Sequence, residues 1–125
     1  MESRPSEQSP DVMVLVPRCR LDASASPVLE RALADCEAQG VVKIVLNFGE
    51  THYISSSSLR VILMHTRKLR REGGDLKLCS LTDKISQVLC ITGLDTIFEA
   101  FPSEELAVQG FRMSPPSVQH TLHGP

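Results

Sequence analysis

The stretch that decides the fold runs from Ile44 to Leu69 and reads IVLNFGETHYISSSSLRVILMHTRKL. It begins with an apolar run that ends at Gly49, a pattern typical of a strand covered on both faces in an α/β sheet. After four consecutive serines, apolar side chains recur at helical spacing from Leu59 onward, and most of the basic residues lie off that stripe. The stretch therefore predicts a buried strand, a short turn and an amphipathic helix, with the serines at the junction.

The serines Ser55 to Ser58 fall where the predicted strand passes into the helix. A serine at a helix start accepts hydrogen bonds from backbone N–H groups that have no partner inside the helix. A phosphate at the same place would be favoured by those N–H groups and by the helix dipole. The alternative is that the serines serve only as turn and cap residues. These hydroxyls are the first candidates for functional chemistry in the chain.

Length and composition exclude several classes of protein. A chain of 125 residues is long enough for one domain with its own core. A formal net charge of −2, no Trp and one Tyr argue against a nucleic-acid surface, which is usually basic and offers rings for base stacking. No apolar run reaches the roughly 20 residues that cross a bilayer, and the N-terminus lacks signal-peptide features. We expect a cytoplasmic protein without membrane insertion.

The sequence gives no sign of a metal centre or of an enzyme. Its four cysteines are widely spaced, without a Cys-x-x-Cys pair or a histidine at ligand spacing, so we expect reduced thiols, no metal and no cofactor. No glycine-flanked nucleophile elbow and no Walker-type phosphate loop accompanies the serines. Hydrolase or transferase chemistry at the serine cluster is therefore the weakest of the functional hypotheses.

The rest of the chain alternates between strand and helix patterns. The predicted elements are a strand at 12–16, a helix from Ser26-Pro27 to about Gln39, a strand at 41–48, a helix at 57–71, a strand at 76–79, a helix from Thr82 or Asp83 to 91, a strand at 97–101 and a helix beginning at Ser103. This alternation predicts an α/β domain with a mixed, partly parallel sheet of about four strands packed against about four helices.

The composition also predicts domain boundaries. Residues 1–10 are polar, with two prolines and no periodicity, which predicts a flexible N-terminal segment. The folded domain is expected at 11–111. Residues 112–125 are rich in proline and polar residues, which predicts a disordered C-terminal tail.

Five short motifs carry further information. They are Leu21-Asp22-Ala23, Val45-Leu46-Asn47-Phe48, Tyr53-Ile54 with the serines and Leu59, Gly73-Gly74-Asp75-Leu76-Lys77-Leu78, and the segment LCITGLDTIF at 89–98. Together and in this order they resemble the STAS domain of bacterial anti-sigma factor antagonists, over roughly residues 12–110. The ordered set is far more specific than any one motif alone. The resemblance implies a single STAS-like domain.

What the resemblance implies is a binding protein rather than an enzyme. In that family the unphosphorylated protein binds an anti-sigma factor that is often also a serine kinase, and phosphorylation of one serine releases the partner. The phospho-acceptor matches Ser56, with Ser57 as the alternative, while Ser55 and Ser58 stand where the family motif has Asp and Gly. A phosphoserine adds nearly two negative charges, which an interface built around a neutral hydroxyl cannot desolvate cheaply.

The candidate partner-binding residues come from the loop before the first helix, the serine junction and the outer face of the second helix. They are Arg20, Asp22, Ser24, Ser55, Ser56, Ser57, Ser58, Arg60 and Met64. The expected partner is an anti-sigma factor or serine kinase, and the sequence does not predict an oligomeric state.

Two other functions are compatible with the resemblance. STAS-like modules are also found bound to cytosolic ATPase subunits of lipid transporters, so one alternative is an accessory subunit of a transporter ATPase complex. The other is a constitutive binding module that is never phosphorylated. Co-purification separates these functions, because an ATPase subunit recovered in constant ratio would contradict a role in a sigma-factor pathway.

Overall fold

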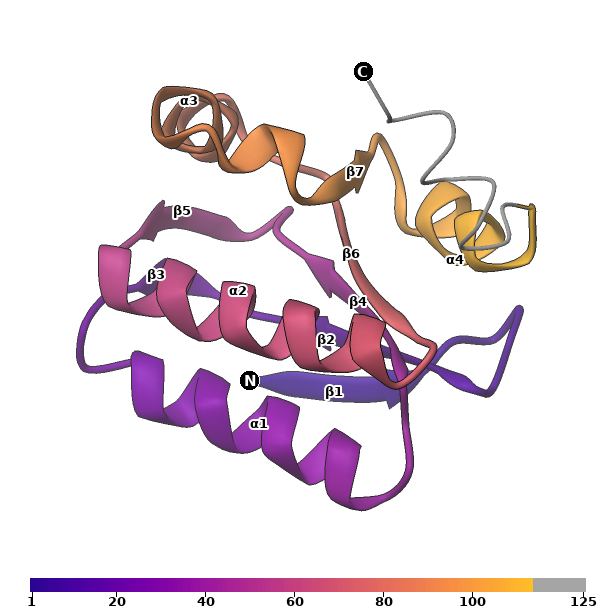
Figure 1. Ribbon diagram of the computed structural model, residues 1–125. Helices are drawn as coiled ribbons and strands as arrows, with labels where there is room; N and C mark the ends of the chain where they lie inside the picture. The colour runs from indigo at the N-terminus through magenta and orange to yellow at the C-terminus, as the bar shows by residue number, and fades with distance from the viewer. Residues whose placement is uncertain (114–125) are drawn as a thin grey trace.

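The computed structural model of the protein describes residues 1–113 (Figure 1). Its strands are β1 (Glu2–Pro5), β2 (Val12–Val16), β3 (Cys19–Leu21), β4 (Lys43–Asn47), β5 (Thr51–Ile54), β6 (Asp75–Cys79) and β7 (Glu99–Phe101). Its helices are α1 (Ser26–Ala38), α2 (Ser56–Arg71), α3 (Asp83–Thr92) and α4 (Glu104–Met113), and a 3-10 turn, η1 (Leu94–Thr96), follows α3. The expected tail from residue 114 onward lies outside the described residues, and the two residues before it end α4.

The strands form two sheets. The larger has the order β1-β2-β4-β6-β7, in which β1 is antiparallel to β2 and all other neighbours are parallel. The smaller pairs β3 with β5 in parallel. The predicted α/β class, with a mixed and mostly parallel sheet and four helices, is confirmed. The expected number of about four strands is too low for residues 1–113, because three short strands lack a recognisable pattern.

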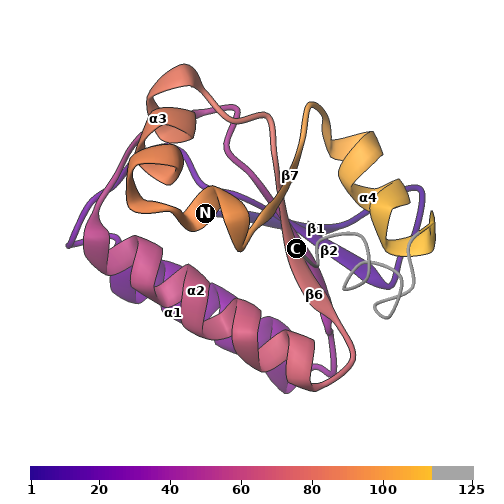
Figure 2. The same ribbon diagram turned by 45° about the horizontal axis from the view of Figure 1, so that its top comes forward.

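Helices cover both faces of the large sheet. α1 and α2 lie side by side over one face and α4 covers the other (Figures 1 and 2). The alternation of side chains along each strand accounts for this, since Leu15 and Leu46 face the first layer while Val14 and Val45 face α4. The strands therefore read as continuous apolar runs, as expected for a sheet buried on both sides.

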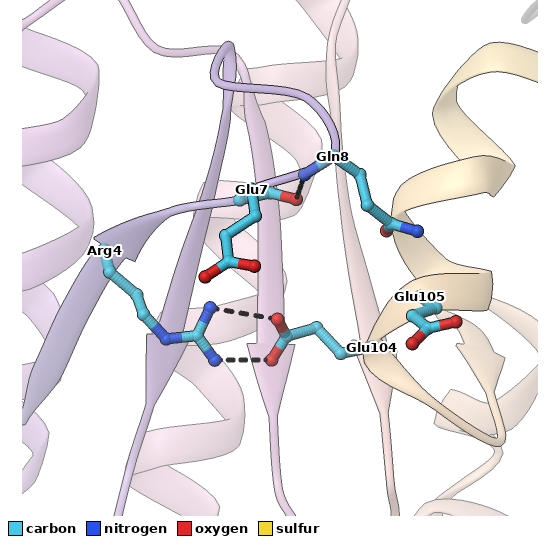
Figure 3. A pocket seen from close by; sticks show the side chains of 6 residues that line it. Arg4, Glu7, Gln8, Glu104 and Glu105 are labelled. Atoms are coloured by element: carbon cyan, nitrogen blue, oxygen red, sulfur yellow. Dashed lines mark hydrogen bonds and ion pairs between the residues drawn. The ribbon is translucent and has the colours of Figure 1, made fainter.

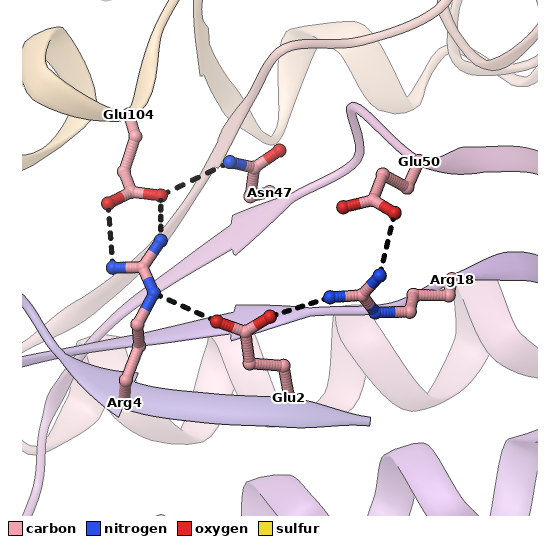
Figure 4. Close-up of polar contacts among 6 residues, drawn as sticks. All are labelled: Glu2, Arg4, Arg18, Asn47, Glu50 and Glu104. Carbon is pink, nitrogen blue, oxygen red and sulfur yellow. Dashed lines mark hydrogen bonds and ion pairs between the residues drawn. The ribbon is translucent and has the colours of Figure 1, made fainter.

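The prediction of a flexible segment at residues 1–10 is wrong for its first half. Glu2–Pro5 form β1, which pairs with β2 in a register that places Ser3 opposite Leu15. Side-chain contacts also hold the strand, because Arg4 forms ion pairs with both Glu2 and Glu104. Figure 4 shows that Glu2, Arg4 and Glu104 form a continuous series of ion pairs. Composition does not reveal such an arrangement, because the Glu104 partner of Arg4 lies 100 positions along the sequence.

The strands β3 and β5 were also not predicted. The sequence around β3 is polar and the sequence before the serines resembles a turn, so neither segment shows the alternation of a half-buried strand. Each strand ends in one buried apolar residue, Leu21 in β3 and Ile54 in β5. These two side chains join the main core and fix the position of the small sheet.

One lysine lies inside the layer between the sheet and α4. Lys77 in β6 is 1% exposed. Its ammonium group contacts the Glu99 carboxylate and lies 3.5 Å from that of Asp75. The rings of Phe111 and Phe101 lie 4.8 and 5.7 Å away. The charge is thus buried with charged and aromatic partners, as a buried cation requires.

Candidate functional site

The small sheet brings the first loop and the serines together. Because β3 and β5 are parallel, their carboxyl ends meet at the same edge, with Leu21 opposite Ile54. The chain leaves β3 into the loop that begins at Asp22, and it leaves β5 into Ser55. The Ser55 N–H donates to the Leu21 carbonyl at 2.8 Å. The loop and the serine junction, which the sequence analysis assigns to one partner-binding surface, therefore lie next to each other.

The serines form the start of α2, as predicted. Ser55 is the N-cap residue with extended backbone, and its Oγ accepts a hydrogen bond from the Ser58 N–H at 3.2 Å. The helix itself begins at Ser56. Ser55 therefore supplies an acceptor to one backbone N–H of the first helical turn, which has no acceptor within the helix itself.

A network of four hydroxyl groups joins the starts of α1 and α2. Ser26 Oγ lies 2.8 Å from Ser57 Oγ and 2.9 Å from Ser58 Oγ. Ser57 Oγ is also 3.0 Å from Ser55 Oγ, and Ser58 Oγ donates to the Leu21 carbonyl at 3.1 Å. Ser58 is fully buried and Ser26 is 8% exposed. The network thus lies between the two helices rather than in solvent.

Ser26 was not predicted as part of this site. The sequence suggests it as the N-cap of α1, but the N-cap is Ala25, without a side-chain hydrogen bond. The Ser26 hydroxyl turns to α2 instead. Cap patterns are local, whereas this contact joins residues 31 and 32 positions apart, so no local signal could have indicated it.

Ser56 differs from the other serines of the junction. It is exposed, and no hydrogen bond of its side chain occurs within residues 1–113. Ser57 is half-buried and bonded to two other hydroxyls. Among the four consecutive serines, Ser56 therefore presents the most accessible hydroxyl.

The loop after β3 presents an ionised carboxylate next to the serines. Asp22 Oδ1 accepts hydrogen bonds from Ser24 Oγ at 2.7 Å and from the Ala25 N–H at 3.0 Å. The hydrogen bond from Ser24, followed by that from Ala25, holds the pKa of Asp22 below its ordinary value. The loop therefore offers a fixed negative charge to a partner.

An exposed aromatic residue, also missed from the sequence, stands beside this loop. Arg20 and Tyr53 are register partners in β3 and β5, and the guanidinium lies 4.3 Å from the centre of the tyrosine ring. Tyr53 is 41% exposed. Its position directly before Ile54 and the serines was the available signal. Stacking of this kind holds both side chains in one arrangement on the surface.

The remaining predicted residues lie further along α2. Arg60 and Met64 follow Ser56 by four and eight positions, so all three share one side of the helix. All three are exposed, and Met64 is 60% exposed. At a rise of 1.5 Å per residue, Met64 lies about 12 Å along the axis from Ser56. These residues extend the surface but do not belong to the hydroxyl network.

The other described parts of the chain contain fewer features of a functional site. Residues 1–113 contain no group of three side chains placed to hold a metal ion, and no helix in that range could span a membrane. A shallow pocket of about 290 Å³ lies between β1 and α4, lined by Arg4, Ser6, Glu7, Gln8, Glu104 and Glu105 (Figure 3). None of the serine-junction residues lines it.

The fold and the site define a class of protein. The STAS domain family model matches residues 3–107, which is most of the chain. The protein belongs to the STAS domain family, as the motifs indicate.

Particular members of that family resemble it closely. The chain is 38% identical over 88 residues to the putative anti-sigma factor antagonist BtrV of Bordetella bronchiseptica, covering 70% of this chain and 76% of that protein. It is 30% identical over 90 residues to the anti-sigma-B factor antagonist of Bacillus subtilis, covering 71% and 81% respectively. The crystal structure of a putative anti-sigma factor antagonist from Thermotoga maritima superposes with a TM-score of 0.81, at 26% identity, and covers 89% of this chain and 93% of that one.

Proposed function

We propose that this protein is an anti-sigma factor antagonist that binds its partner through the surface around the serine junction and is released by phosphorylation of Ser56. It acts by binding, without catalysis, in the cytoplasm. The observation that carries the proposal is the contrast within the serine junction, since Ser56 alone among the four is both exposed and outside the hydroxyl network. The relatives named as anti-sigma factor antagonists support the same function.

The chemistry at Ser56 requires only its hydroxyl from this chain. In the kinase complex, Ser56 Oγ attacks the γ-phosphorus of ATP, the bond from that phosphorus to ADP breaks, and the hydroxyl proton leaves to the kinase or to water. The product carries nearly two negative charges and three additional acceptor oxygens. Because Ser56 makes no side-chain hydrogen bond within residues 1–113, the phosphate leaves the contacts between α1 and α2 intact.

The surrounding surface suits a protein partner. The stacked Arg20 and Tyr53 supply an ordered aromatic and cationic contact of the kind that dominates binding energy at interfaces. Asp22 supplies a carboxylate for a basic side chain of the partner, and Met64 adds apolar area on α2. A doubly charged phosphate in the middle of this surface would have to lose its hydration on binding, so the phosphorylated protein dissociates from the anti-sigma factor.

The test compares the protein isolated from its own cells with its Ser56→Ala variant by intact mass and by the proteins that co-purify. We expect one phosphate adduct on the wild type, none on Ser56→Ala, and an anti-sigma factor held only by unphosphorylated chains. Ser57→Ala is the matched control and should keep the adduct. An adduct that persists in Ser56→Ala contradicts the acceptor assignment.

The same experiment separates the alternative functions. A transporter ATPase subunit recovered in constant ratio with both forms would identify an accessory subunit and overturn the proposal. An anti-sigma factor held equally by both forms, with no adduct on either, would identify a constitutive binding module.

A further inference from the structure

We infer that Ser26 is the positioning residue that restricts phosphorylation to Ser56, because it holds the hydroxyls of Ser57 and Ser58 in a closed hydrogen-bond relay between α1 and α2. The biological meaning of this role rests on the proposed function. The physical role itself is a property of the folded chain alone and is tested without any partner.

The directions of the hydrogen bonds follow from counting protons. A serine hydroxyl donates one hydrogen bond, and a backbone carbonyl can only accept. Ser58 Oγ therefore donates to the Leu21 carbonyl, and it accepts from Ser26 Oγ at 2.9 Å. Ser26 has then used its proton, since its approach to the Asp22 carbonyl is longer at 3.4 Å, so in this arrangement Ser57 is the donor in the 2.8 Å contact between them.

The relay is completed by the N-cap residue. Ser55 Oγ lies 3.0 Å from Ser57 Oγ and 3.2 Å from Ser58 Oγ, so its single proton is shared between these two acceptors, while it accepts from the Ser58 N–H. The order is thus Ser55 to Ser57 to Ser26 to Ser58 to the Leu21 carbonyl. Every hydroxyl in this order donates once and accepts at least once, so the relay is fully satisfied. Ser26 is its only member from α1.

A phosphate on Ser57 is incompatible with this relay. Phosphorylation replaces the proton that Ser57 donates to Ser26, and the added phosphoryl group needs space where Ser26 and Ser55 Oγ now lie within 3.0 Å. Either Ser57 rotates outward and loses both contacts, or α1 and α2 separate at their starts. A phosphate on Ser56 breaks none of these hydrogen bonds.

Ser58 is excluded as a phosphorylation site both because it is buried and because its hydroxyl is hydrogen-bonded. Its side chain is 0% exposed, so a kinase cannot reach the hydroxyl while α1 is docked. Burial thus excludes Ser58, and the contacts with Ser26 and Ser55 exclude Ser57, so Ser56 is the accessible acceptor among the three serines that begin α2.

The test places phosphoserine at position 56 or 57 of the full-length chain by genetic code expansion, with Ser26 present or changed to alanine, and measures unfolding by urea. Phosphoserine at 56 should leave the folding equilibrium constant close to that of the unmodified protein. Phosphoserine at 57 should lower it roughly tenfold or more, since at least one net hydrogen bond is lost. In the Ser26→Ala background, phosphoserine at 57 should lower the folding equilibrium constant by a smaller factor, because the contact between Ser26 and Ser57 is already absent.

The coupling between Ser26 and position 57 is the readout that a merely structural residue would not give. Ser24→Ala is the matched control, since Ser24 is an exposed serine of the same loop that bonds to Asp22 and not to α2. Ser24→Ala should not change the factor by which phosphoserine at 57 lowers the folding equilibrium constant. If phosphoserine at 57 prevents folding, Ser57→Ala in both backgrounds measures the same coupling.

Two results would overturn the role of Ser26. One is an equal folding constant for phosphoserine at 56 and at 57, and the other is a penalty at 57 that is independent of Ser26. Neither depends on whether the protein is phosphorylated in cells, so failure of the proposed function and failure of this role are distinguishable.

Discussion

The guanidinium of Arg4 in β1 and the carboxylate of Glu104 in α4 form two parallel hydrogen bonds, 3.0 and 2.8 Å long, across 100 residues of chain (Figure 3). Asn47 Nδ2 donates a third hydrogen bond to the same carboxylate at 3.1 Å. The Glu2 carboxylate joins Arg4 to Arg18, as Figure 4 shows. The ion pair between Arg4 and Glu104 thus joins the first strand to the last helix of the described residues.

This arrangement predicts a dependence of stability on pH. The hydrogen bond from Arg4 is the main cause that lowers the pKa of Glu104 from its ordinary value of 4.5. Since folding lowers this pKa, the ionised form stabilises the fold above pH 4.5, and the contribution is lost as the pH falls through the folded-state pKa. Glu104→Gln should lower the free energy of unfolding at pH 7 by about 1 kcal/mol, the upper range for a partly exposed pair.

Urea unfolding from pH 7 to pH 3 checks this prediction. The difference between Glu104→Gln and wild type should narrow below pH 4.5, because the wild-type carboxylate becomes protonated there. Glu105→Gln, an exposed neighbour in α4, is the control and should follow the wild type. Parallel curves for Glu104→Gln and wild type at every pH would show that the ion pair contributes nothing.

Two adjacent glycines before β6 should respond differently to alanine. A Cβ at Gly74 would lie 1.8 Å from the Val42 carbonyl oxygen, whereas a Cβ at Gly73 meets nothing within 4 Å and only strains a φ of +87°. We expect Gly74→Ala to destabilise the protein by about 3 kcal/mol and Gly73→Ala by about 1 kcal/mol. Thermal and urea unfolding measure both, and an equal loss would contradict the close approach of β6 to Val42.

Lys77 should be required for stability because of its charge. Lys77→Met keeps most of the volume but leaves the carboxylates of Asp75 and Glu99 without this cation. The free energy of unfolding should fall by about 3 kcal/mol, as when one partner of a buried pair is removed. Lys84→Met, on the exposed side of α3, should change it by less than about 0.5 kcal/mol. A Lys77→Met protein as stable as wild type would show that the pair gives no net stabilisation.

Tyr53 should matter for binding rather than for folding. Under the proposed function, Tyr53→Ala should weaken the anti-sigma factor complex by roughly 2 kcal/mol, while Tyr53→Phe keeps the ring under Arg20 and should bind nearly normally. Leu106→Ala, an exposed residue of α4 on the opposite face of the sheet, is the control. Isothermal titration calorimetry with the co-purified anti-sigma factor gives the affinities. Unchanged binding of Tyr53→Ala would remove this residue from the interface.

The elements with long apolar periodicity were predicted almost to the residue. The strand at 12–16 coincides with β2, and the helix expected at 57–71 begins one residue earlier. The strands β1, β3 and β5 were missed because their three or four residues contain no apolar run, unlike the segment that includes β7. Periodicity needs a longer segment than these strands offer.

The residues of the candidate site were likewise predicted only in part. The motifs indicated that Asp22 and the serines belong to one site, and the parallel pairing of β3 with β5 places them together. Ser26 and Tyr53 were missed as site residues. Their roles depend on contacts between α1 and α2 and between the two short strands, and local sequence patterns carry no information on such contacts.

The buried position of Lys77 has a consequence for the lifetime of the molecule. Amines react with acylating metabolites only when they are exposed, and the Lys77 side chain is enclosed beneath α4 with an acidic partner. It becomes reachable only when α4 opens locally. Acyl groups at this one lysine would therefore accumulate as a record of how often the last helix had detached since the chain was synthesised.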